Sequence, residues 1–383
     1  MKRLTLGDVC KKASSNIAQK DLQDKMGVYP IYGASGLIKQ VDFYQQDKEY
    51  IAVVKDGAGI GRTMLLPAYS SVIGTMQYLL PKEGIPIDIK YLFYAVEHMN
   101  LAKYFSGATI PHIYFKDYQK EPINIPDIDT QRKISRIFDK IDALVTSRKE
   151  QRTKLDQIVM SRFIEMFGDP ITNEMGWEKV QLSTCIESID NGKSLVCDTS
   201  ARQGNWPAVL KLSAATYGFY RPEENKAMLD ENQFVEDAAV RAGDLLFTRK
   251  NTPELVGMCA YVYDTPSRLM MPDLIFRLNT TNRCNKVFLW KLINHNLFRD
   301  CIRAISTGSA KSMSNISKER LLNLEIILPP AELQEQFAVF VAQIDKSKYR
   351  QEKCIGFFQC LEKTLDRSGY DVEFWLSQNE KRI

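Results

Sequence analysis

Metal-binding residues are scarce in this sequence, and no two cysteines lie close together. The 383 residues include 3 histidines, His98, His112 and His295, and 8 cysteines. No pair of cysteines is separated by two residues, and a zinc cluster normally requires such a spacing. We therefore expect no metal site, and scattered cysteines of this kind are typical of reduced thiols in a cytoplasmic protein.

Long apolar stretches are also missing. No run approaches the roughly 20 apolar residues that a helix needs to cross a bilayer. The first residues, MKRLTLGDVC, lack the apolar core of a signal peptide. We therefore expect no membrane partner. The net charge of +4 is a mild basic excess, which is compatible with nucleic-acid binding but does not indicate it.

Catalytic signatures are missing as well. The sequence contains no GxxxxGK[ST] loop for ATP and no Ser/His/Asp or paired-carboxylate pattern above chance. The stretch KDGAGIG at 55–61 is rich in glycine, but RTMLLP follows it with the pattern of a strand and not of a helix. We interpret it as a turn between two strands, with a backbone approach to a phosphate group as the alternative. We expect no catalytic residue and no cofactor bound by this chain.

A long internal repeat is the most informative feature that is present. The segments DTQRKISRIFDKIDALV at 129–145 and ELQEQFAVFVAQIDKSK at 332–348 align at an offset of 203, so that Gln131 meets Gln334. The start of the chain matches WEKVQLSTCI at 177–186 at an offset of 176. The second copy is thus longer by 203 − 176 = 27 residues, and the added residues lie in its middle. Similar ends and different middles indicate one scaffold that carries two recognition surfaces.

Each copy ends in a segment with the apolar spacing of a long helix. From residue 130 to residue 167, apolar residues recur in steps of three and four, with an N-cap expected at Asp129 or Thr130 and a stop at Gly168. The apolar stripe needs a partner, and the simplest is the equivalent helix of the other copy, packed as an antiparallel coiled coil. Packing of each helix on its own domain is the alternative. The residues expected to pair the helices are Ile134, Phe138, Ile141, Val145, Leu155 and Val159 in the first, and Phe337, Val341, Ile344, Ile355 and Phe358 in the second.

The regions that precede the helices have mixed patterns. Short apolar runs separated by glycine-containing turns predict strands, and 88–105 and 286–302 have helical spacing. The fold class expected is α+β, with two mixed α/β recognition domains that are each followed by a long helix. The boundaries predicted are 1–128 and 171–329 for the two domains, 129–170 for the first spacer helix, and 330–383 for the second spacer helix with the C-terminal tail.

Two segments and their spacing resemble a known family. PINIPDIDTQRKISRIFDKID in the first copy and IILPPAELQEQFAVFVAQID in the second are similar to the specificity subunit of type I restriction-modification systems. The resemblance spans nearly the whole chain. The first copy departs from the pattern, because IPDIDTQ lacks the double proline and the Glu before Gln that the second copy has.

This resemblance implies a function in DNA recognition. Each domain would read one half of a bipartite, asymmetric site in double-stranded DNA, and the helices would fix the gap between the halves. The chain would dock two modification subunits, which bind S-adenosylmethionine and methylate adenine N6. A restriction subunit that uses ATP and Mg can join such a complex. The chain itself lacks the NPPY or DPPY tetrapeptide of an adenine methyltransferase, which argues against the alternative of a stand-alone methyltransferase.

Basic and small polar residues in glycine-containing loops are the candidates for DNA contacts. Side chains of Arg, Lys and Asn read base edges, and Lys, Arg, Ser and Thr bind phosphates. A solvated surface loop is the competing interpretation for each residue. Arg148 and Arg152 interrupt the apolar stripe of the first long helix. Contact with DNA, contact with a partner subunit and exposure to solvent are the alternatives for these two residues. The candidates are Lys55, Arg62, Thr109, His112, Tyr114 and Lys116 in the first domain, and Arg249, Lys250, Asn251, Ser309, Lys311, Ser312 and Asn315 in the second.

A coiled-coil interaction scaffold without specific DNA reading is the second functional hypothesis. The duplicated domains with different middles argue against it, because a scaffold has no need of two different surfaces. Salt-sensitive and sequence-dependent DNA binding separates the two hypotheses.

Overall fold

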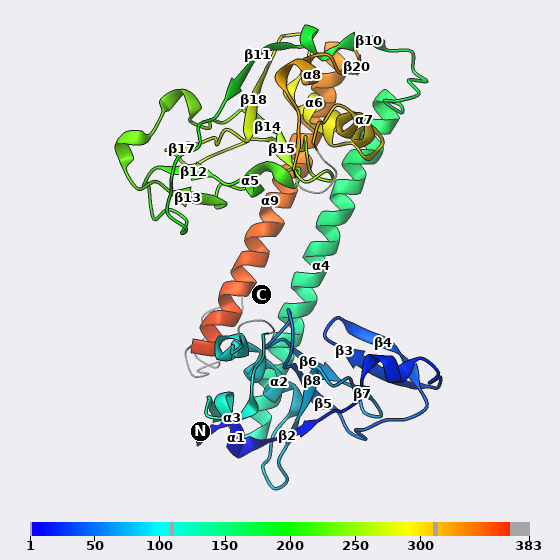
Figure 1. Cartoon of the computed structure of the whole chain (residues 1–383), viewed down its shortest axis with the longest axis vertical. Helices are drawn as coiled ribbons and strands as arrows, with labels where there is room; N and C mark the ends of the chain where they lie inside the picture. Colours follow the sequence, from blue (N-terminus) through cyan, green and yellow to red (C-terminus); the bar gives the residue numbers. More distant parts are fainter. Residues whose placement is uncertain (1, 108–110, 309–312, 368–383) are drawn as a thin grey trace. The chain divides into compact units, whose positions relative to one another are not determined.

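A computed structural model describes residues 2–107, 111–308 and 313–367 of the chain (Figure 1). In the last helix, the side chains of residues 349, 350, 352, 353 and 357–367 are not described. The chain divides into two compact units, of which unit 1 comprises residues 1–149 and 352–383, and unit 2 comprises residues 150–351. Each of the two long helices therefore contributes residues to both units.

In the part of unit 1 that the structure describes, the strands form three small sheets. The strands at the two ends of the domain sequence pair antiparallel, and these are β1 (Lys2–Thr5) and β9 (Pro122–Ile125). A four-stranded sheet has the order β2 (Cys10–Ser14), β8 (Met76–Pro81), β5 (Tyr50–Val54), β6 (Thr63–Leu66). A three-stranded sheet has the order β4 (Gly36–Val41), β3 (Tyr29–Gly33), β7 (Ser71–Val72).

The helices of unit 1 cover the four-stranded sheet and supply its main core. The buried side chains of β5 and β8 pack with those of α2 and of the first half of α4. The predicted strand–turn–strand at 50–66 is confirmed by the pairing of β5 with β6. The helices are α1 (Leu6–Val9), η1 (Gln19–Leu22), α2 (Ile89–His98), η2 (Leu101–Tyr104), α3 (Phe115–Tyr118) and α4 (Ile128–Phe167).

The sheets of unit 2 repeat this arrangement. The pair β10 (Glu178–Gln181) and β20 (Glu325–Leu328) corresponds to the end-strand pair of unit 1. The four-stranded sheet has the order β11 (Ile186–Asn191), β18 (Ile275–Thr280), β14 (Leu245–Thr248), β16 (Cys259–Tyr261). The remaining strands form a sheet of β13 (Asn225–Ala227), β12 (Ala208–Leu210) and β17 (Leu269–Met270), and a pair of β15 (Lys250–Asn251) and β19 (Ser314–Asn315).

The helices of unit 2 also follow the order of unit 1. A helix after the four-stranded sheet, α6, packs its apolar residues into the core together with α9 and the last turns of α4. The elements are η3 (Leu182–Thr184), α5 (Ser213–Thr216), η4 (Glu231–Gln233), η5 (Glu236–Ala238), α6 (Lys286–Asn294), η6 (Asn296–Phe298), α7 (Arg299–Ala304), α8 (Lys318–Leu322) and α9 (Ala331–Arg367).

The two units therefore share one fold, including the middles that look unrelated in sequence. In unit 1, β3 pairs antiparallel with β4 and parallel with β7. In unit 2, β12 pairs in the same way with β13 and β17. The predicted mixture of helices and sheets is confirmed. The antiparallel pair β5–β6 of unit 1 corresponds to the pair β14–β16 of unit 2.

A buried glutamine fixes the start of each long helix. Gln131 accepts a hydrogen bond at Oε1 from Asp88 N at 2.8 Å. Its Nε2 donates to Pro126 O at 2.9 Å and to Pro86 O at 3.1 Å. Because Asp88 is the N-cap of α2, one side chain joins the start of α4 to the start of α2.

The same three bonds occur in unit 2. Gln334 accepts at Oε1 from Asn285 N at 2.8 Å, and its Nε2 donates to Pro329 O at 2.7 Å and to Arg283 O at 3.1 Å. Asn285 is the N-cap of α6. Both glutamines are fully buried, with 0% exposure, and this explains why the sequence repeats a Gln at this position.

The ends of α4 agree in part with the sequence analysis. Gly168 follows the helix with a φ of +72°, as expected for a glycine at a helix C-terminus. The N-cap prediction of Asp129 or Thr130 is wrong, because Asp127 accepts hydrogen bonds from Thr130 N at 2.9 Å and from Thr130 Oγ1 at 2.7 Å. The helix begins at Ile128, two residues before the predicted start.

In unit 1, the apolar stripe of α4 packs on the domain that precedes it. Ile134, Phe138, Ile141 and Val145 belong to the core that α2 and β5 also supply. The Phe138 ring stacks on the ring of Tyr94 at a centroid distance of 4.8 Å. These four residues were predicted to pair the two helices, and the structure instead places them against their own domain, as the alternative expected. Ile355 of α9 packs against the same core.

In unit 2, α4 and α9 contact each other directly. Val159, Phe337 and Val341 are buried in one core, against which Ile344 packs, and Leu155 is half-buried. The order of contacts is antiparallel, because residue numbers rise along α9 as they fall along α4. The pairs are Phe163 with Phe337, Arg162 with Phe340, Asp156 with Lys348, and Gln151 with Gln351. The side chain of Phe358 lies outside those described.

Candidate nucleic-acid interface

In unit 1, the glycine-rich turn between β5 and β6 lies against the segment that leads to α3. Ile113 N donates to Lys55 O at 3.0 Å, and Gly57 N donates to Pro111 O at 3.0 Å. Lys55 N donates to Thr75 O at 3.0 Å. Two loops that lie more than fifty residues apart in the sequence therefore contact each other and form one surface.

Five side chains of this surface form a cluster around a carboxylate. The Asp56 carboxylate contacts His112 Nδ1 and lies 3.8 Å from Lys55 Nζ. The Tyr114 ring lies 4.1 Å from the His112 ring, and Lys116 Nζ lies 5.2 Å from the Tyr114 ring. Asp56 was not among the candidates, although its place between a lysine and a glycine in KDGAGIG is a usable signal.

Arg62 connects this turn to the three-stranded sheet. Its side chain donates to Ala34 O, in the turn between β3 and β4, at 2.8 Å. The preceding Gly61 has a φ of +80°, and a Cβ there would lie 2.4 Å from Ala102 N. Only glycine fits this approach of the turn to η2.

Unit 2 builds the equivalent surface from the same backbone contacts. Ile316 N donates to Arg249 O at 2.9 Å, and Arg249 N donates to Leu274 O at 3.0 Å. Gly257 has a φ of +73°, and a Cβ there would lie 2.3 Å from Ile302 Cγ2. Lys55 and Arg249 therefore hold equivalent positions, as do Gly61 and Gly257. The backbone of this surface is common to both units.

The side chains on the unit 2 surface include two buried polar atoms without a partner. Among the residues that the structure describes, neither Arg249 Nε nor Asn315 Oδ1 has a hydrogen-bond partner. The Arg249 guanidinium lies 5.2 Å from the Phe276 ring. Asn315 pairs with Lys250 in the strand pair β15–β19. A buried N–H donor and a buried carbonyl acceptor that the described residues leave open are suited to a ligand that supplies their partners.

Equivalent positions carry different chemistry in the two units. The strand pairing matches Asp56 with His112 in unit 1 and Lys250 with Asn315 in unit 2. Unit 1 therefore has an acidic residue, Asp56, at the position where unit 2 has a basic residue, Lys250. Asn251 is buried and donates to Thr216 Oγ1 at 3.1 Å, so its side chain holds α5 and does not face outward. The candidates that lie outside the described residues are Thr109, Ser309, Lys311 and Ser312.

A second difference lies where α4 meets α2 in unit 1 and where α9 meets α6 in unit 2. In unit 1, Tyr94 Oη donates to Asp139 Oδ1 at 2.9 Å and to Asp142 Oδ2 at 3.0 Å. Burial raises the pKa of Tyr94, and the hydrogen bond to Asp139 raises it further. The tyrosine therefore stays neutral and acts as a donor.

Unit 2 has a lysine at the position of Tyr94. Lys291 and Tyr94 each lie six residues after their N-cap residue. Burial lowers the pKa of Lys291 to about 8, against the opposing attraction of Asp345. The Asp345 carboxylate accepts from Tyr263 Oη at 3.0 Å and lies 3.1 Å from Lys348 Nζ. At this position, unit 1 therefore has a neutral hydrogen-bond donor, Tyr94, and unit 2 has a partly desolvated cation, Lys291.

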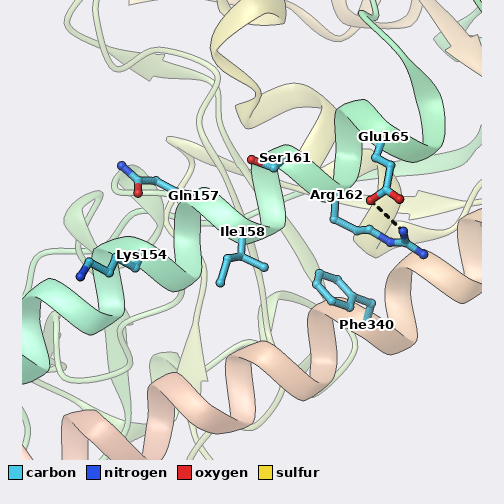
Figure 2. Close-up of a pocket in the computed structure, with 7 residues that line it drawn as sticks. All are labelled: Lys154, Gln157, Ile158, Ser161, Arg162, Glu165 and Phe340. Carbon is cyan, nitrogen blue, oxygen red and sulfur yellow. Dashed lines mark ion pairs between the residues drawn. The ribbon is translucent and has the colours of Figure 1, made fainter.

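The pair of α4 and α9 in unit 2 carries an open groove of about 660 Å³. Figure 2 shows Ile158 and Arg162 of α4 pointing toward α9, where Phe340 faces them. The Arg162 guanidinium lies 5.9 Å from the Phe340 ring and 2.8 Å from Glu165 Oε2. Ile158 is 47% exposed. The groove therefore combines apolar and charged side chains, as expected of a protein contact surface.

The described parts of the chain contain neither a candidate metal cluster nor a candidate membrane span. In residues 2–107, 111–308 and 313–367, no group of three or more His, Cys, Asp or Glu side chains could hold a metal ion. Within those same ranges, no helix is both long enough and apolar enough to pass through a bilayer.

Comparison with known proteins identifies the family. The model of the type I restriction modification DNA specificity domain matches residues 1–157 and 174–354. The chain belongs to this family. The two matched regions correspond to the two copies of the repeat, so the chain contains two specificity domains.

Curated relatives of the chain are specificity subunits of type I restriction enzymes. The EcoEI subunit of Escherichia coli is 31% identical over 196 residues, which are 50% of this chain and 33% of the relative. The EcoprrI subunit of Escherichia coli is 28% identical over 155 residues, 39% of this chain and 38% of the relative. These two matches thus span little more than a third of each relative. The MjaVIII subunit of Methanocaldococcus jannaschii is 22% identical over 320 residues, 77% of this chain and 72% of the relative.

Solved structures of specificity subunits share the fold. The type I restriction-modification S subunit from M. genitalium has a TM-score of 0.58 at 13% identity, over 96% of this chain and 95% of that one. A structure described for complex assembly and conformational transition of the type I system has a TM-score of 0.50 at 14% identity, over 96% of this chain and 97% of that one. The chain therefore has the fold of known specificity subunits.

Proposed function

We propose that the chain is the DNA-specificity subunit of a type I restriction-modification complex, and that it binds a bipartite, asymmetric site in double-stranded DNA. One half of the site binds to the recognition domain at 1–128 and the other to the domain at 171–329. The chain is non-catalytic and binds no cofactor. We expect it in the cytoplasm, where its DNA is found.

The observation that carries this proposal is the pair of equivalent surfaces with different side chains. Both surfaces have the same backbone hydrogen bonds, from Ile113 to Lys55 and from Ile316 to Arg249. A shared framework presents the same geometry to each half-site, and different side chains select different bases. Two different halves make an asymmetric site.

The two long helices act as the spacer between the halves. The α4 helix has 40 residues, which at 1.5 Å per residue give a length of about 60 Å. The antiparallel contacts from Phe163–Phe337 to Gln151–Gln351 support a coiled coil along α4 and α9. A stiff spacer would fix the number of base pairs between the halves, as half-site spacing does in other DNA-binding proteins.

The helices also dock two modification subunits, which carry S-adenosylmethionine and methylate adenine N6. The groove at Ile158, Arg162 and Phe340 supports this role, since it leaves apolar side chains exposed on the helix pair. A restriction subunit that uses ATP and Mg joins the complex where the host encodes one.

Methylation mapping tests the proposal directly. The chain is produced together with the modification subunit from the neighbouring gene, and methylated adenines are mapped across the host genome. We expect one split motif, with two specified blocks around an unspecified gap. Deleting seven residues from the middle of α4, together with seven facing residues of α9, should change the gap and leave both blocks unchanged. A stable complex that methylates nothing would instead favour the interaction scaffold without DNA reading.

The two halves of the motif are assigned by substitutions in one unit at a time. The double variant Arg249→Ala, Asn315→Ala should weaken selection of one block only. The matched variant Lys179→Ala removes an exposed lysine that pairs with Glu325 on β20 at 3.6 Å, and it should change neither block. A loss of both blocks from the first variant would contradict the assignment of one half-site to each unit.

A further inference from the structure

The connection between β12 and β13 is the largest addition that unit 2 makes to the shared fold. Fourteen residues, 211–224, separate these strands. In unit 1, two residues, 34 and 35, separate the equivalent strands β3 and β4. This addition accounts for 12 of the 27 extra residues of the second copy. The connection includes α5, next to β12 in Figure 1.

The added segment contains a ladder of arginines and aromatic rings. The Phe219 ring lies 4.8 Å from the guanidinium carbon of Arg152 and 5.0 Å from that of Arg221. The Arg221 guanidinium also lies 5.5 Å from the Tyr217 ring. Arg152 belongs to α4, so the ladder joins the spacer helix to the added segment. Contacts of this kind hold a planar guanidinium in one orientation.

Two hydrogen bonds to backbone carbonyl groups hold the ladder in place. Trp290 Nε1 donates to Gly218 O at 2.9 Å, and Arg221 N donates to Ala214 O at 3.0 Å. The residues of the ladder are therefore bonded to α6 through Gly218 and to α5 through Arg221. At its end Tyr217 stays 54% exposed.

The ladder adjoins the candidate DNA surface of unit 2. The buried side chain of Asn251 in β15 donates to Thr216 Oγ1, one residue before Tyr217, at 3.1 Å. In unit 1 the bond from Arg62 to Ala34 O links the corresponding turns. The short turn of unit 1 and the long segment of unit 2 thus meet the recognition surface at the same place. Only the long segment brings an arginine and an exposed aromatic ring with it.

We propose that Arg221 and Tyr217 bind a phosphodiester of the DNA backbone beside the second half-site, and that Arg152 is a positioning residue that holds Phe219 and through it Arg221. This inference rests on the proposed DNA-specificity function. Arg221 Nε lies 4.0 Å from Glu223 Oε1, and the Glu223 side chain is 68% exposed. Such a long and exposed ion pair is weak, so a phosphate can replace the carboxylate as the partner of Arg221.

The chemistry favours a phosphate over a base edge. The aromatic rings flank the guanidinium and fix its plane, and an oriented guanidinium binds phosphate oxygens with two parallel hydrogen bonds. Tyr217 adds a phenolic hydroxyl donor beside it. A phosphate contact fixes the position of the DNA and carries no sequence information. The contact would thus strengthen binding at the second half-site without changing its sequence.

The test uses the complex of the full chain with its modification subunits, and a duplex that contains the mapped motif. Arg221→Gln is compared with Arg283→Gln, which removes another exposed unit 2 arginine that pairs with Glu178 at 3.1 Å. We expect Arg221→Gln to raise the dissociation constant about 5- to 20-fold and to reduce the slope of log K against log salt by about 1. The methylated motif should stay the same. Tyr217→Leu should raise the dissociation constant about 2- to 5-fold.

A double-mutant cycle tests the role of Arg152. If Arg152 acts through Arg221, Arg152→Gln weakens binding on its own, and adding it to Arg221→Gln causes no further loss. Additive losses would assign Arg152 a separate contact and overturn its positioning role. A purely structural ladder would lower the stability of unit 2 in each variant and leave the salt slope unchanged.

The outcomes distinguish this inference from the proposed function. Specific, salt-dependent binding by the wild-type complex, with Arg221→Gln indistinguishable from Arg283→Gln, would overturn only the phosphate contact. A changed methylation motif in Arg221→Gln would also overturn it, because Arg221 would then read a base. Absence of specific binding in the wild-type complex would contradict the proposed function itself.

Discussion

The two units combine one framework with opposite surface chemistry. The buried glutamines, Gln131 and Gln334, make the same three hydrogen bonds, and Gly61 and Gly257 allow the same close approach of a turn. At the candidate DNA surface, unit 1 has a carboxylate that is already paired, whereas unit 2 has buried polar atoms for which the described residues supply no partner. Residues that bond to the backbone or allow its close approach are therefore the same in both units. Residues whose side chains lie on the surface differ between the units.

The strongest effect should come from removing the shared glutamine. Gln334→Ala leaves Asn285 N and two carbonyl oxygens buried without a partner, so we expect it to lower the free energy of unfolding of unit 2 by about 2–4 kcal/mol. Urea unfolding followed by tryptophan fluorescence reports this, because Trp177, Trp206 and Trp290 belong to unit 2. Gln131→Ala should destabilise unit 1 by a similar amount, as measured by hydrogen exchange of residues 2–107.

An exposed glutamine on the same helix provides the control. Gln343→Ala on α9 should change the free energy of unfolding by less than about 0.5 kcal/mol. If Gln334→Ala behaved like this control, the glutamine would not be what fixes the start of the helix. If only one of the two units responded, the shared role would be wrong.

The next effect should separate the equivalent residues Arg249 and Lys55. Arg249 Nε is buried and has no hydrogen-bond partner among the described residues, whereas Lys55 Nζ lies 3.8 Å from Asp56 Oδ2. We expect Arg249→Ala to weaken DNA binding by the assembled complex by about 1–3 kcal/mol, and Lys55→Ala to weaken it by less than about 1 kcal/mol. Titration of both variants against the mapped duplex at one salt concentration measures this difference. Equal losses would mean that the ion pair in unit 1 opens when DNA binds.

A pH series should sharpen the contrast between Tyr94 and Lys291. The pKa of Lys291 in the folded unit is about 8, below the value of about 10.4 in an unfolded chain. Between these values the unfolded state binds more protons, so the free energy of unfolding of unit 2 rises with pH, and below pH 8 the full cost is present. We expect Lys291→Met to stabilise unit 2 by roughly 1–2 kcal/mol at pH 7 and by less as the pH approaches 10.

Urea unfolding at pH 7, 8, 9 and 10 measures this difference from the wild type. Lys179→Met replaces an exposed lysine of unit 2 and should show no such trend. A difference between Lys291→Met and the wild type that stays constant with pH would mean that the charge on Lys291 is not what destabilises the folded unit.

Much of the fold could be predicted from the sequence, because the residues that fix the helices recur periodically or are repeated in both copies. The offset of 203 between Gln131 and Gln334 marks the two helix starts, and the apolar spacing from 130 to 167 marks α4. The partner of the stripe could not be predicted in the same way. Phe138 stacks on Tyr94 of its own domain, whereas Phe163 contacts Phe337 of the other helix, and apolar spacing alone does not distinguish these two environments.

Only the outline of the candidate DNA surface could be drawn from the sequence, and its contact with DNA stays a prediction. Loop composition pointed to Lys55, His112 and Arg249, but nothing local indicated that Asp56 pairs with His112 or that Asn251 faces inward toward Thr216. These contacts depend on which distant loop lies beside the turn, and the fold decides this through backbone hydrogen bonds between segments far apart in the chain.

The smallest effect should come from making unit 1 more like unit 2 in charge. Asp56→Asn removes a carboxylate at the position that Lys250 occupies in the other unit. If DNA phosphates pass this surface, we expect binding to tighten about 2- to 5-fold at roughly 0.1 M salt, with a smaller gain at higher salt. Asp129→Asn, which removes an exposed carboxylate from α4, should leave the affinity unchanged.

The opposite result for Asp56→Asn would be as informative. A carboxylate can accept a hydrogen bond from the N4 amino group of cytosine, and Asp56 also contacts His112 Nδ1. Weaker binding together with an altered block of the methylated motif would therefore assign Asp56 to base reading in unit 1. The difference between the two units would then lie in which bases they select and not in how strongly each attracts the DNA backbone.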